Sequence, residues 1–396
     1  MPNDSLSTLR VVVAGGSIGG LCASLALHGN GANVDIFERH SGPMETRGAG
    51  IVVQGQLTEL LQRHHAPPLS TTSCRVRRYL EPDGGNGQTQ PMPQSFTSWE
   101  SIYITLRAIF PNERYHAGAA LLAFEDKRET VSANISGYDQ IDADLLVCAD
   151  GAQSEMRRRL LPEVQPHYAG YIAWRGTLDE ASAAPALVKF FDDTFTFSEA
   201  RSGGHILAYF IPGAKADPSP GRRQINWVWY VHANHEDLER LLTDRDGHQH
   251  HNSLPQGGAT DEAIAELRAL AHREVHPRMT ELIEATPDPF IQKIFDVVVP
   301  RTVFGRACLL GDAAFVVRPH TAGATAKAAT DAMLLADVLQ QSGGDVKKAL
   351  SAFQSAQLRY GRELHQYGVA LGNRWAQLVE RMGHDGRGTS RVRPAT

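Results

Sequence analysis

The sequence predicts an α/β fold with two parts: a parallel sheet flanked by helices, and a second lobe built on a mostly antiparallel sheet. Three observations predict it. A strand, a glycine-rich turn and a helix open the chain at residues 9–28 and lead into a second strand. Two later apolar runs end in an acidic residue, as that second strand does. Residues 168–231 are instead rich in aromatic and β-branched side chains that alternate with other residues.

The bulk properties are those of a globular protein with more than one domain. The chain has 396 residues, of which 42% are hydrophobic and 21% charged, so a sizeable core is available. Its formal net charge of -5 provides no basic field for nucleic acid. The four scattered cysteines predict reduced thiols and no metal site. We expect no membrane-spanning segment and a cytoplasmic protein.

A strand, helix, strand unit comes first along the chain. Leu9–Ala14 is a short apolar run, a helix is expected over residues 21–28, and Asn33–Glu38 is the second strand. Two strands joined in this way are parallel. The turn between strand and helix reads Gly-Gly-Ser-Ile-Gly-Gly, a setting in which backbone N–H groups and the helix dipole receive a pyrophosphate.

An acidic residue ends the second strand. Glu38 stands 18 residues beyond Gly20, where a carboxylate can accept hydrogen bonds from ribose hydroxyls. Arg39 beside it would cover an adenine or simply be solvated. The glycine turn and Glu38 together predict a dinucleotide site of the Rossmann-like type.

The middle of the chain predicts a hairpin and two further strands that end in acids. Residues 74–92 form the hairpin around a turn at 82–87, a helix follows over 100–110, and two strands flank residues 125–130. The apolar runs 143–149 and 307–310 lead to Asp150 and Asp312. In a parallel sheet these acids converge with Glu38 at the carboxyl edge, where such folds bind ligands. Asp150 could equally cap a helix over 155–161.

The second lobe and the C-terminal segment follow from their periodicity. Residues 205–211 and 226–230 alternate as strands do, separated by a loop at 212–223. Trp174, Trp227 and Trp229 could wall an aromatic pocket or fill the core. Residues 346–382 are largely helical, and the stripe Tyr360, Leu364, Tyr367 and Leu371 is expected to pack against the first lobe.

Three segments carry a family resemblance. GGSIGG within residues 9–38, ADLLVCADGAQSEMRRRLL at 143–161 and GRACLLGDAAFVVRPHTAGATAKAATDA at 305–332 together resemble the fingerprints of the aromatic-ring flavoprotein hydroxylases, the para-hydroxybenzoate hydroxylase-like FAD monooxygenases. The resemblance covers most of the chain. Segments 48–54, 168–176, 205–213 and 250–255 are most similar to members that hydroxylate pyridine rings.

The resemblance implies a division of the chain. Residues 1–73, 100–165 and 295–345 would form a discontinuous FAD-binding domain with a Rossmann-like parallel sheet. Residues 74–99 and 166–294 would form the substrate-binding lobe, and residues 346–396 the C-terminal helices and tail.

It also implies the cofactor contacts. Asp312 would bond the ribityl hydroxyls, Asp150 would lie near both FAD and the nicotinamide donor, and a helix beginning near Thr321 would aim its N-terminus at the flavin ring. This chain has Phe315 where the family often has His, and Ile104 where many members place an Arg. With Arg39 added for its position beside Glu38, the expected FAD contacts are Gly15, Ser17, Ile18, Gly20, Glu38, Arg39, Asp150, Asp312, Pro319, Ala322, Gly323, Ala324 and Thr325.

The activity implied is hydroxylation of a hydroxylated aromatic ring, a hydroxypyridine in the first place. NADH or NADPH would bind transiently and reduce FAD, and O2 would be the cosubstrate, acting through a flavin C4a-hydroperoxide. The partner is then a small aromatic substrate, and a homodimer is left open. An FAD-dependent dehydrogenase or reductase without oxygen transfer, and a nucleotide-binding protein without redox chemistry, are the alternatives.

A catalytic base would help the substrate hydroxyl lose its proton. His250 is the first candidate, because it matches a histidine of the related pyridine hydroxylases. Tyr209 and Tyr230, on the expected strands of the substrate lobe, are the alternatives.

Overall fold

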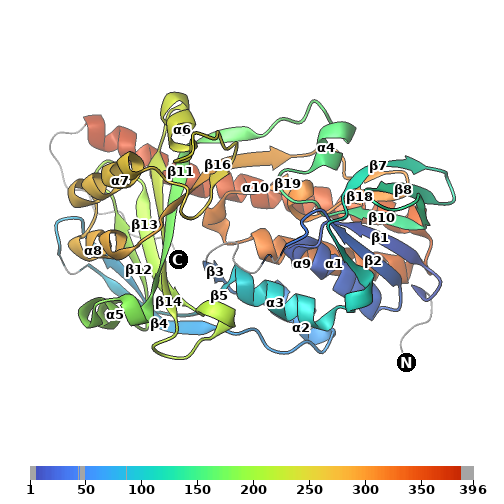
Figure 1. Ribbon diagram of the computed structural model, residues 1–396, viewed down its shortest axis with the longest axis horizontal. Coiled ribbons are helices and arrows are strands. Elements are labelled where there is room, and N and C mark those ends of the chain that lie inside the picture. Colours follow the sequence, from blue (N-terminus) through green and yellow to red (C-terminus); the bar gives the residue numbers. More distant parts are fainter. Residues whose placement is uncertain (1–5, 43, 45–49, 86, 385–396) are drawn as a thin grey trace.

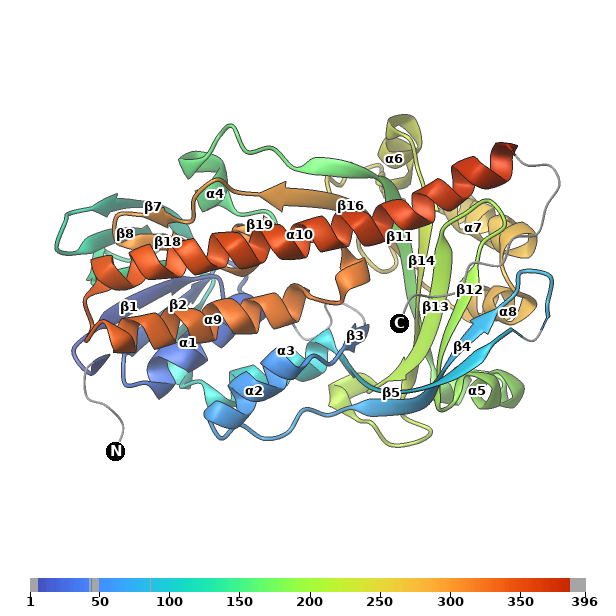
Figure 2. The same cartoon turned by 180° about the vertical axis from the view of Figure 1, so that it is seen from behind.

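Two sheets at opposite ends of the molecule organise the fold, and one long helix runs along both (Figures 1 and 2). The computed structural model describes residues 6–42, 44, 50–85 and 87–384, with side chains described up to residue 374. The segment 48–54, which contributes to the family resemblance, therefore lies partly outside the described residues. Among the described residues, none of the helices combines the length and the apolar character that crossing a membrane requires.

The first sheet has six strands in the order β17-β18-β10-β1-β2-β6. All adjacent pairs are parallel except β17 with β18. The predicted parallel sheet is confirmed. Its strands are β1 (Arg10–Ala14), β2 (Asn33–Glu38), β6 (Tyr115–Ala117), β10 (Leu145–Cys148), β17 (Val303–Phe304) and β18 (Ala307–Leu309).

Both faces of this sheet are covered. One apolar core joins the sheet to helices α1 (Ile18–Gly29), α2 (Gly55–Arg63), α3 (Trp99–Ile109) and α9 (Ala324–Gln341). The other face packs against a three-stranded sheet of β7 (Leu121–Asp126), β8 (Val131–Ile135) and β9 (Ile141–Ala143). Helix α1 begins at Ile18, three residues before the predicted start, so the glycine pair 19–20 lies within its first turn.

The second sheet has a main path of nine strands in the order β15-β16-β11-β14-β13-β12-β4-β5-β3. All of these pairs are antiparallel except β12 with β4, so the mostly antiparallel lobe is confirmed. Strand β19 (Phe315–Val316) also pairs with β16. The strands of the path are β3 (Gly50–Val52), β4 (Thr72–Leu80), β5 (Thr89–Ser98), β11 (His167–Asp179), β12 (Thr194–Glu199), β13 (His205–Ile211), β14 (Gln224–His232), β15 (Ser253–Leu254) and β16 (Phe290–Val298).

The outer face of the second sheet carries the tryptophans. Trp174, Trp227 and Trp229 belong to a buried core formed with helices α5 (Pro185–Phe191), α6 (His235–Leu241), α7 (Asp261–Glu274) and α8 (Pro277–Ala285). The indole N–H of Trp227 donates to Thr286 Oγ1 at 2.8 Å. These side chains therefore fill the core, and the alternation of the strands turns the residues between them to the opposite, inner face.

Helix α10 (Val346–His384) is a single long helix that lies across both sheets (Figure 2). The predicted stripe does not face the protein throughout, because Tyr367 is 57% exposed. Glycines face the protein instead. A Cβ at Gly361 would lie 2.5 Å from the Phe315 ring, and one at Gly372 would lie 2.8 Å from Arg318 Nη1. The helix approaches its neighbours too closely for larger side chains at these positions.

Candidate functional site

The carboxyl edge of the parallel sheet brings the acid-bearing loops together. In the strand register, Ala14 lies beside Phe37 and Cys148, and Cys148 lies beside Leu309. The residues that follow these positions, among them Gly15, Glu38, Asp150 and Asp312, therefore lie along one edge.

The glycine turn is shaped by close backbone approaches. Gly15 has a φ of +107°, and a Cβ there would lie 2.3 Å from the carbonyl oxygen of Ala149. Its N–H donates to the Phe37 carbonyl at 2.8 Å. Ser17 is the N-cap residue of α1, and the first-turn N–H groups of a helix have no intrahelical acceptor. The turn can thus accept only glycine at residue 15 and presents donors toward the sheet edge.

Glu38 is buried at this edge and already holds the turn. Its Oε2 accepts from the Gly16 N–H at 2.7 Å, and its Oε1 from the His40 N–H at 2.9 Å. Tyr115, a residue that sequence analysis missed, donates its hydroxyl to the Gly16 carbonyl at 3.1 Å. Burial, with Tyr103 beside it, raises the pKa of Tyr115, so its hydroxyl stays neutral. Arg39 is exposed.

Asp150 acts first as a helix cap. Its Oδ2 accepts from the N–H groups of Glu155 at 2.8 Å and Met156 at 3.3 Å, at the start of α4 (Glu155–Leu160). Its Oδ1 is buried and has no hydrogen-bond partner in the described part of the chain. Arg157 on α4 donates to the Asp312 carbonyl at 3.2 Å and so ties two loops of the edge together.

Asp312 has a buried cation beneath it. The residue lies in a 3₁₀ turn, η5 (Gly311–Ala313), and its side chain is 40% exposed. The Lys327 Nζ, on a side chain only 1% exposed, lies 3.2 Å from Asp312 Oδ1. Behind Lys327, the buried Asp331 accepts from the Gly311 N–H at 3.1 Å. Sequence analysis missed Lys327, which resembles an ordinary lysine of an alanine-rich helix.

The turn before α9 differs from the prediction. Residues Pro319–Thr321 form a 3₁₀ turn, η6, and Ala322 follows with a φ of +50°, so α9 begins at Ala324 rather than near Thr321. Thr321 Oγ1 accepts the Gly323 N–H at 3.0 Å and stabilises this break. The residue before η6 is Arg318, which forms a buried ion pair with Asp296 of β16 at 2.9 Å. The turn is therefore held rigidly against the second sheet.

An imidazole and phenol cluster lies where η6 meets the inner face of the second sheet. His320 Nε2 lies 2.8 Å from the Tyr171 hydroxyl, and its ring centroid is 4.4 Å from that of Tyr230. His320 Nδ1 is buried without a hydrogen-bond partner among the described residues. Burial and the Arg318 charge lower the pKa of His320 to about 4. Burial, with His320 nearby, lowers the pKa of His205 to about 3. Both rings are therefore neutral at neutral pH.

The predicted tyrosines lie on this inner face, and His250 does not contact them. Tyr209 packs against Phe96 with ring centroids 4.3 Å apart, and burial raises its pKa. Burial raises the pKa of Tyr230 to about 12. His250 lies in the loop before β15 and bonds Asp244 at 2.8 Å; the hydrogen bonds and ring contacts of the described residues do not join it to either tyrosine.

The same loop holds the described side chains that come closest to a metal-ligand set. Asp244, Asp246 and His248 could bring their ligand atoms within 4.8 Å of one another, and two of the three are exposed. Exposed acidic groups are common without an ion, so this cluster indicates no metal by itself.

The residues at the sheet edge fit a flavin dinucleotide. The glycine turn offers backbone donors beside the buried Glu38, as a diphosphate and a ribose require. Asp312 presents acceptors to a polyhydroxylated chain. The start of α9 carries small residues and no side-chain cap among the described residues, which leaves its N–H groups for the flavin ring.

Comparisons with known proteins agree with this arrangement. A family model described as FAD binding domain-like matches residues 168–296. The chain is 34% identical over 384 residues, 96% of this chain and 94% of the relative, to 2,6-dihydroxypyridine 3-monooxygenase of Paenarthrobacter nicotinovorans. It is 25% identical to 6-hydroxynicotinate 3-monooxygenase of Pseudomonas fluorescens over 94% of this chain and 92% of that protein. The structure of 2,6-dihydroxypyridine-3-hydroxylase from Arthrobacter nicotinovorans superposes with a TM-score of 0.85 at 32% identity, over 97% of this chain and 95% of the other.

Proposed function

Because the chain belongs to the FAD-dependent aromatic-ring hydroxylases, we propose that it hydroxylates a hydroxypyridine. It is an FAD-dependent monooxygenase that uses NADH or NADPH and O2. Bound FAD, reduced by NADH or NADPH, would activate O2 so that one oxygen atom is transferred to the ring and the other leaves as water. The protein's own residues bind the cofactor, orient the ring, exclude water and move a proton.

The observation that carries the substrate assignment is the unpaired His320 Nδ1 on a rigid turn. A buried imidazole nitrogen without a partner is unfavourable unless a ligand provides one. The turn that presents it also carries Pro319, which the family places against the flavin ring. A hydroxylated ring between η6 and the inner face of the second sheet would meet this nitrogen with its hydroxyl group.

His320 is the base in this proposal, in place of His250. In the tautomer whose Nε2–H donates to the Tyr171 oxygen, Nδ1 presents a lone pair to the substrate hydroxyl. The lowered pKa of His320 keeps that lone pair available at neutral pH. Tyr209 and Tyr230 would wall the ring as neutral phenols, because burial raises the pKa of both.

The residues proposed to hold FAD are distributed along the sheet edge. Gly15, Ser17, Ile18 and Gly20 would bind the diphosphate, Glu38 the ribose, and Asp312 the ribityl chain with Lys327 as its counter-charge. Asp150 Oδ1 is the one oxygen of that carboxylate still unbonded, and it would face the ligands of this edge. Pro319 and the backbone of Ala322, Gly323, Ala324 and Thr325 would line the ring, while Arg39 remains solvated.

The test is turnover by the purified yellow protein. Addition of 2,6-dihydroxypyridine should stimulate NADH or NADPH oxidation, with one O2 consumed for each hydroxylated product. Oxidation that no ring stimulates, with hydrogen peroxide as the product, would instead indicate a reductase. Each of the four cysteines is a buried free thiol, which supports the proposal of a reducing, cytoplasmic location.

A further inference from the structure

Arg175 lies on the inner face of the second sheet without an anionic partner. It is on β11 next to the outward-facing Trp174, and its charge acts on Tyr209 and Tyr230, whose pKa values it lowers against the larger effect of burial. Its Nη1 donates to Gln292 Oε1 at 2.9 Å. It forms no ion pair within the described residues, and its buried Nε has no hydrogen-bond partner there.

Asn226 on β14 adds a second unpaired donor to the same face. The residue is completely buried, and its Oδ1 accepts the Gly50 N–H at 2.9 Å. Its Nδ2 is buried with no hydrogen-bond partner in the described part of the chain. Asn226 lies opposite Tyr209 of the neighbouring strand β13. The next inward-facing residue of β14 is Val228, which lies opposite Arg175 of β11. The two donors are therefore close neighbours on the sheet.

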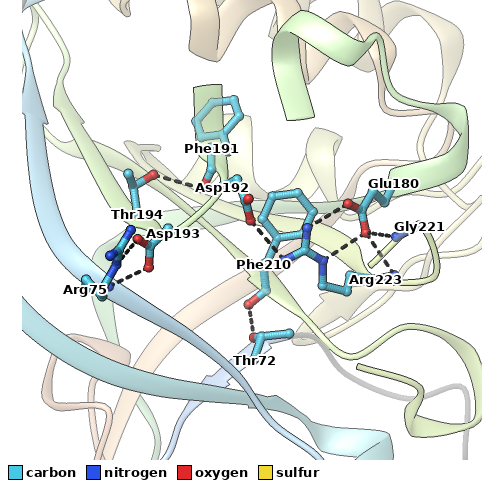
Figure 3. Close-up of polar contacts among 10 residues, drawn as sticks. All are labelled: Thr72, Arg75, Glu180, Phe191, Asp192, Asp193, Thr194, Phe210, Gly221 and Arg223. Carbon is cyan, nitrogen blue, oxygen red and sulfur yellow. Dashed lines mark hydrogen bonds and ion pairs between the residues drawn. The ribbon is translucent and has the colours of Figure 1, made fainter. Parts of the chain in front are cut away.

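The other arginines that are buried or partly buried in this way are compensated by acceptors. Arg318 has Asp296, Arg157 has three backbone carbonyls, and Arg223 has Glu180 and Asp192 (Figure 3). Arg77 on β4 is the nearest parallel to Arg175, because it too bonds a glutamine and has an unpaired Nε. Its guanidinium, however, lies over the rings of Phe195 and Phe197. Arg175 has no such ring contact among the described residues.

We propose that Arg175, with the Asn226 amide, binds an anionic oxygen of the aromatic substrate. The inference rests on the proposed function and specifies its substrate class: a ring that enters carrying a negative charge, either on a deprotonated hydroxyl other than the one that faces His320 or on a carboxylate. Hydrogen-bond donors that remain unpaired favour a ligand with an acceptor atom. A guanidinium, which is always charged, favours an anionic one. The anionic oxygen would complete the hydrogen bonds that both side chains lack.

The experiment measures ring binding to the oxidised holoenzyme through the flavin absorption spectrum. The ligands are 2,6-dihydroxypyridine, the carboxylated 6-hydroxynicotinate, and the neutral 2,6-dimethoxypyridine. The variants are R175M, R175K and, as a matched control that also removes a guanidinium bonded to glutamine, R77M. Circular dichroism and FAD content establish that each variant is folded and loaded.

R175M should weaken binding of the anionic ring about 10- to 100-fold, which corresponds to about 1.4 to 2.8 kcal/mol. The affinity of R175M for the neutral ring, and that of R77M for the anionic ring, should change less than about twofold. R175K should bind the anionic ring better than R175M does. Whichever anionic ring depends on Arg175 identifies the source of the charge. Equal weakening of neutral and anionic rings, or no weakening, would overturn the inference.

The failure of the proposed function is a separate result. If the wild-type protein binds an anionic ring through Arg175 but never hydroxylates it, the proposed activity fails and the inference on Arg175 stands. If the wild-type protein hydroxylates the ring and R175M binds it equally well, the activity stands and the inference fails.

Discussion

Arg223 and Arg175 belong to the same lobe and have opposite surroundings. Arg223 lies immediately before β14, and its side chain is 14% exposed. The guanidinium donates to both carboxylate oxygens of Glu180 and to Asp192, and its Cζ lies 4.1 Å from the centroid of the Phe210 ring (Figure 3). The bond from Arg223 holds the pKa of Glu180 below its usual range. Arg175 bonds only an amide. The first arginine is complete within the chain, whereas the second is complete only with a ligand.

The difference separates two uses of a buried polar group. When all its partners are in the chain, removing the group destabilises the fold, because it leaves a buried charge without its counter-charge. When a partner is missing from the chain, removing the group leaves the fold intact and weakens the binding of the ligand that would supply the partner. His320 falls in the second class with Arg175, since its Nδ1 is buried without a hydrogen-bond partner among the described residues.

The largest effect is expected from breaking the complete pair. R223M leaves the buried Glu180 carboxylate with backbone N–H donors but no cation, and should lower the free energy of unfolding by about 3–5 kcal/mol. R175M should lower it by less than about 1 kcal/mol. Urea unfolding of the apoproteins measures both. R75M is the control, because Arg75 is 85% exposed beside Asp193 and its pair contributes at most about 1 kcal/mol. Equal losses for R223M and R175M would remove the distinction.

Replacing His320 should affect the rate more than the stability. H320Q removes the proposed base and should lower kcat about 100-fold for the hydroxypyridine, within the range for general bases. Folding and FAD content should be retained. H250Q is the matched control, since His250 bonds Asp244 in a polar loop, and its kcat should change less than about twofold. A large fall in H250Q with none in H320Q would return the base to His250.

Replacing Asp312, or Lys327 as its counter-charge, should weaken the binding of FAD. D312A should raise the Kd for FAD about tenfold or more, because the ribityl hydroxyls lose their acceptor. K327M should act in the same direction, since Lys327 holds the Asp312 carboxylate at 3.2 Å. Flavin fluorescence during titration of the apoproteins gives the Kd. Undiminished FAD content in D312A would eliminate its assigned role.

The effect of pH comes last, because it is absent at neutral pH and appears only in acid. His320 and His205 have folded pKa values of about 4 and about 3, below the value of 6.5 for an unfolded histidine. Between pH 6.5 and about 4 the unfolded chain therefore binds more protons, and the free energy of unfolding falls as pH falls. Each histidine contributes up to about 1.4 kcal/mol per pH unit in this window, and nothing above it. H320Q should remove one such contribution from the apoprotein; an unchanged slope would show that His320 is not buried neutral.

Much of the first sheet could be predicted from the sequence. The glycine turn, Glu38 and the acids after two later strands each depend on local rules: a positive φ at Gly15, a close backbone approach, and the parallel order of strand, helix and strand. Such features are encoded by neighbours in the chain. The predicted convergence at one sheet edge follows from the parallel topology, and the register agrees with it.

The second lobe could be predicted only as a sheet, without its faces. Alternation identifies two faces but does not say which one a helix covers, and the tryptophans lie on the covered face. Tyr367 was expected inside and is outside, because glycines rather than large residues mark the buried side of α10. Hydrophobic periodicity cannot detect a face made by close backbone contact.

The sequence by itself determined the family, the cofactor and the edge that we propose binds it, because those depend on short segments whose geometry is local. Only the tertiary structure decided which polar groups lack a partner. Arg175, Asn226 and His320 are ordinary residues in the printed sequence, and whether a polar group is compensated depends on strands and helices that lie far apart along the chain.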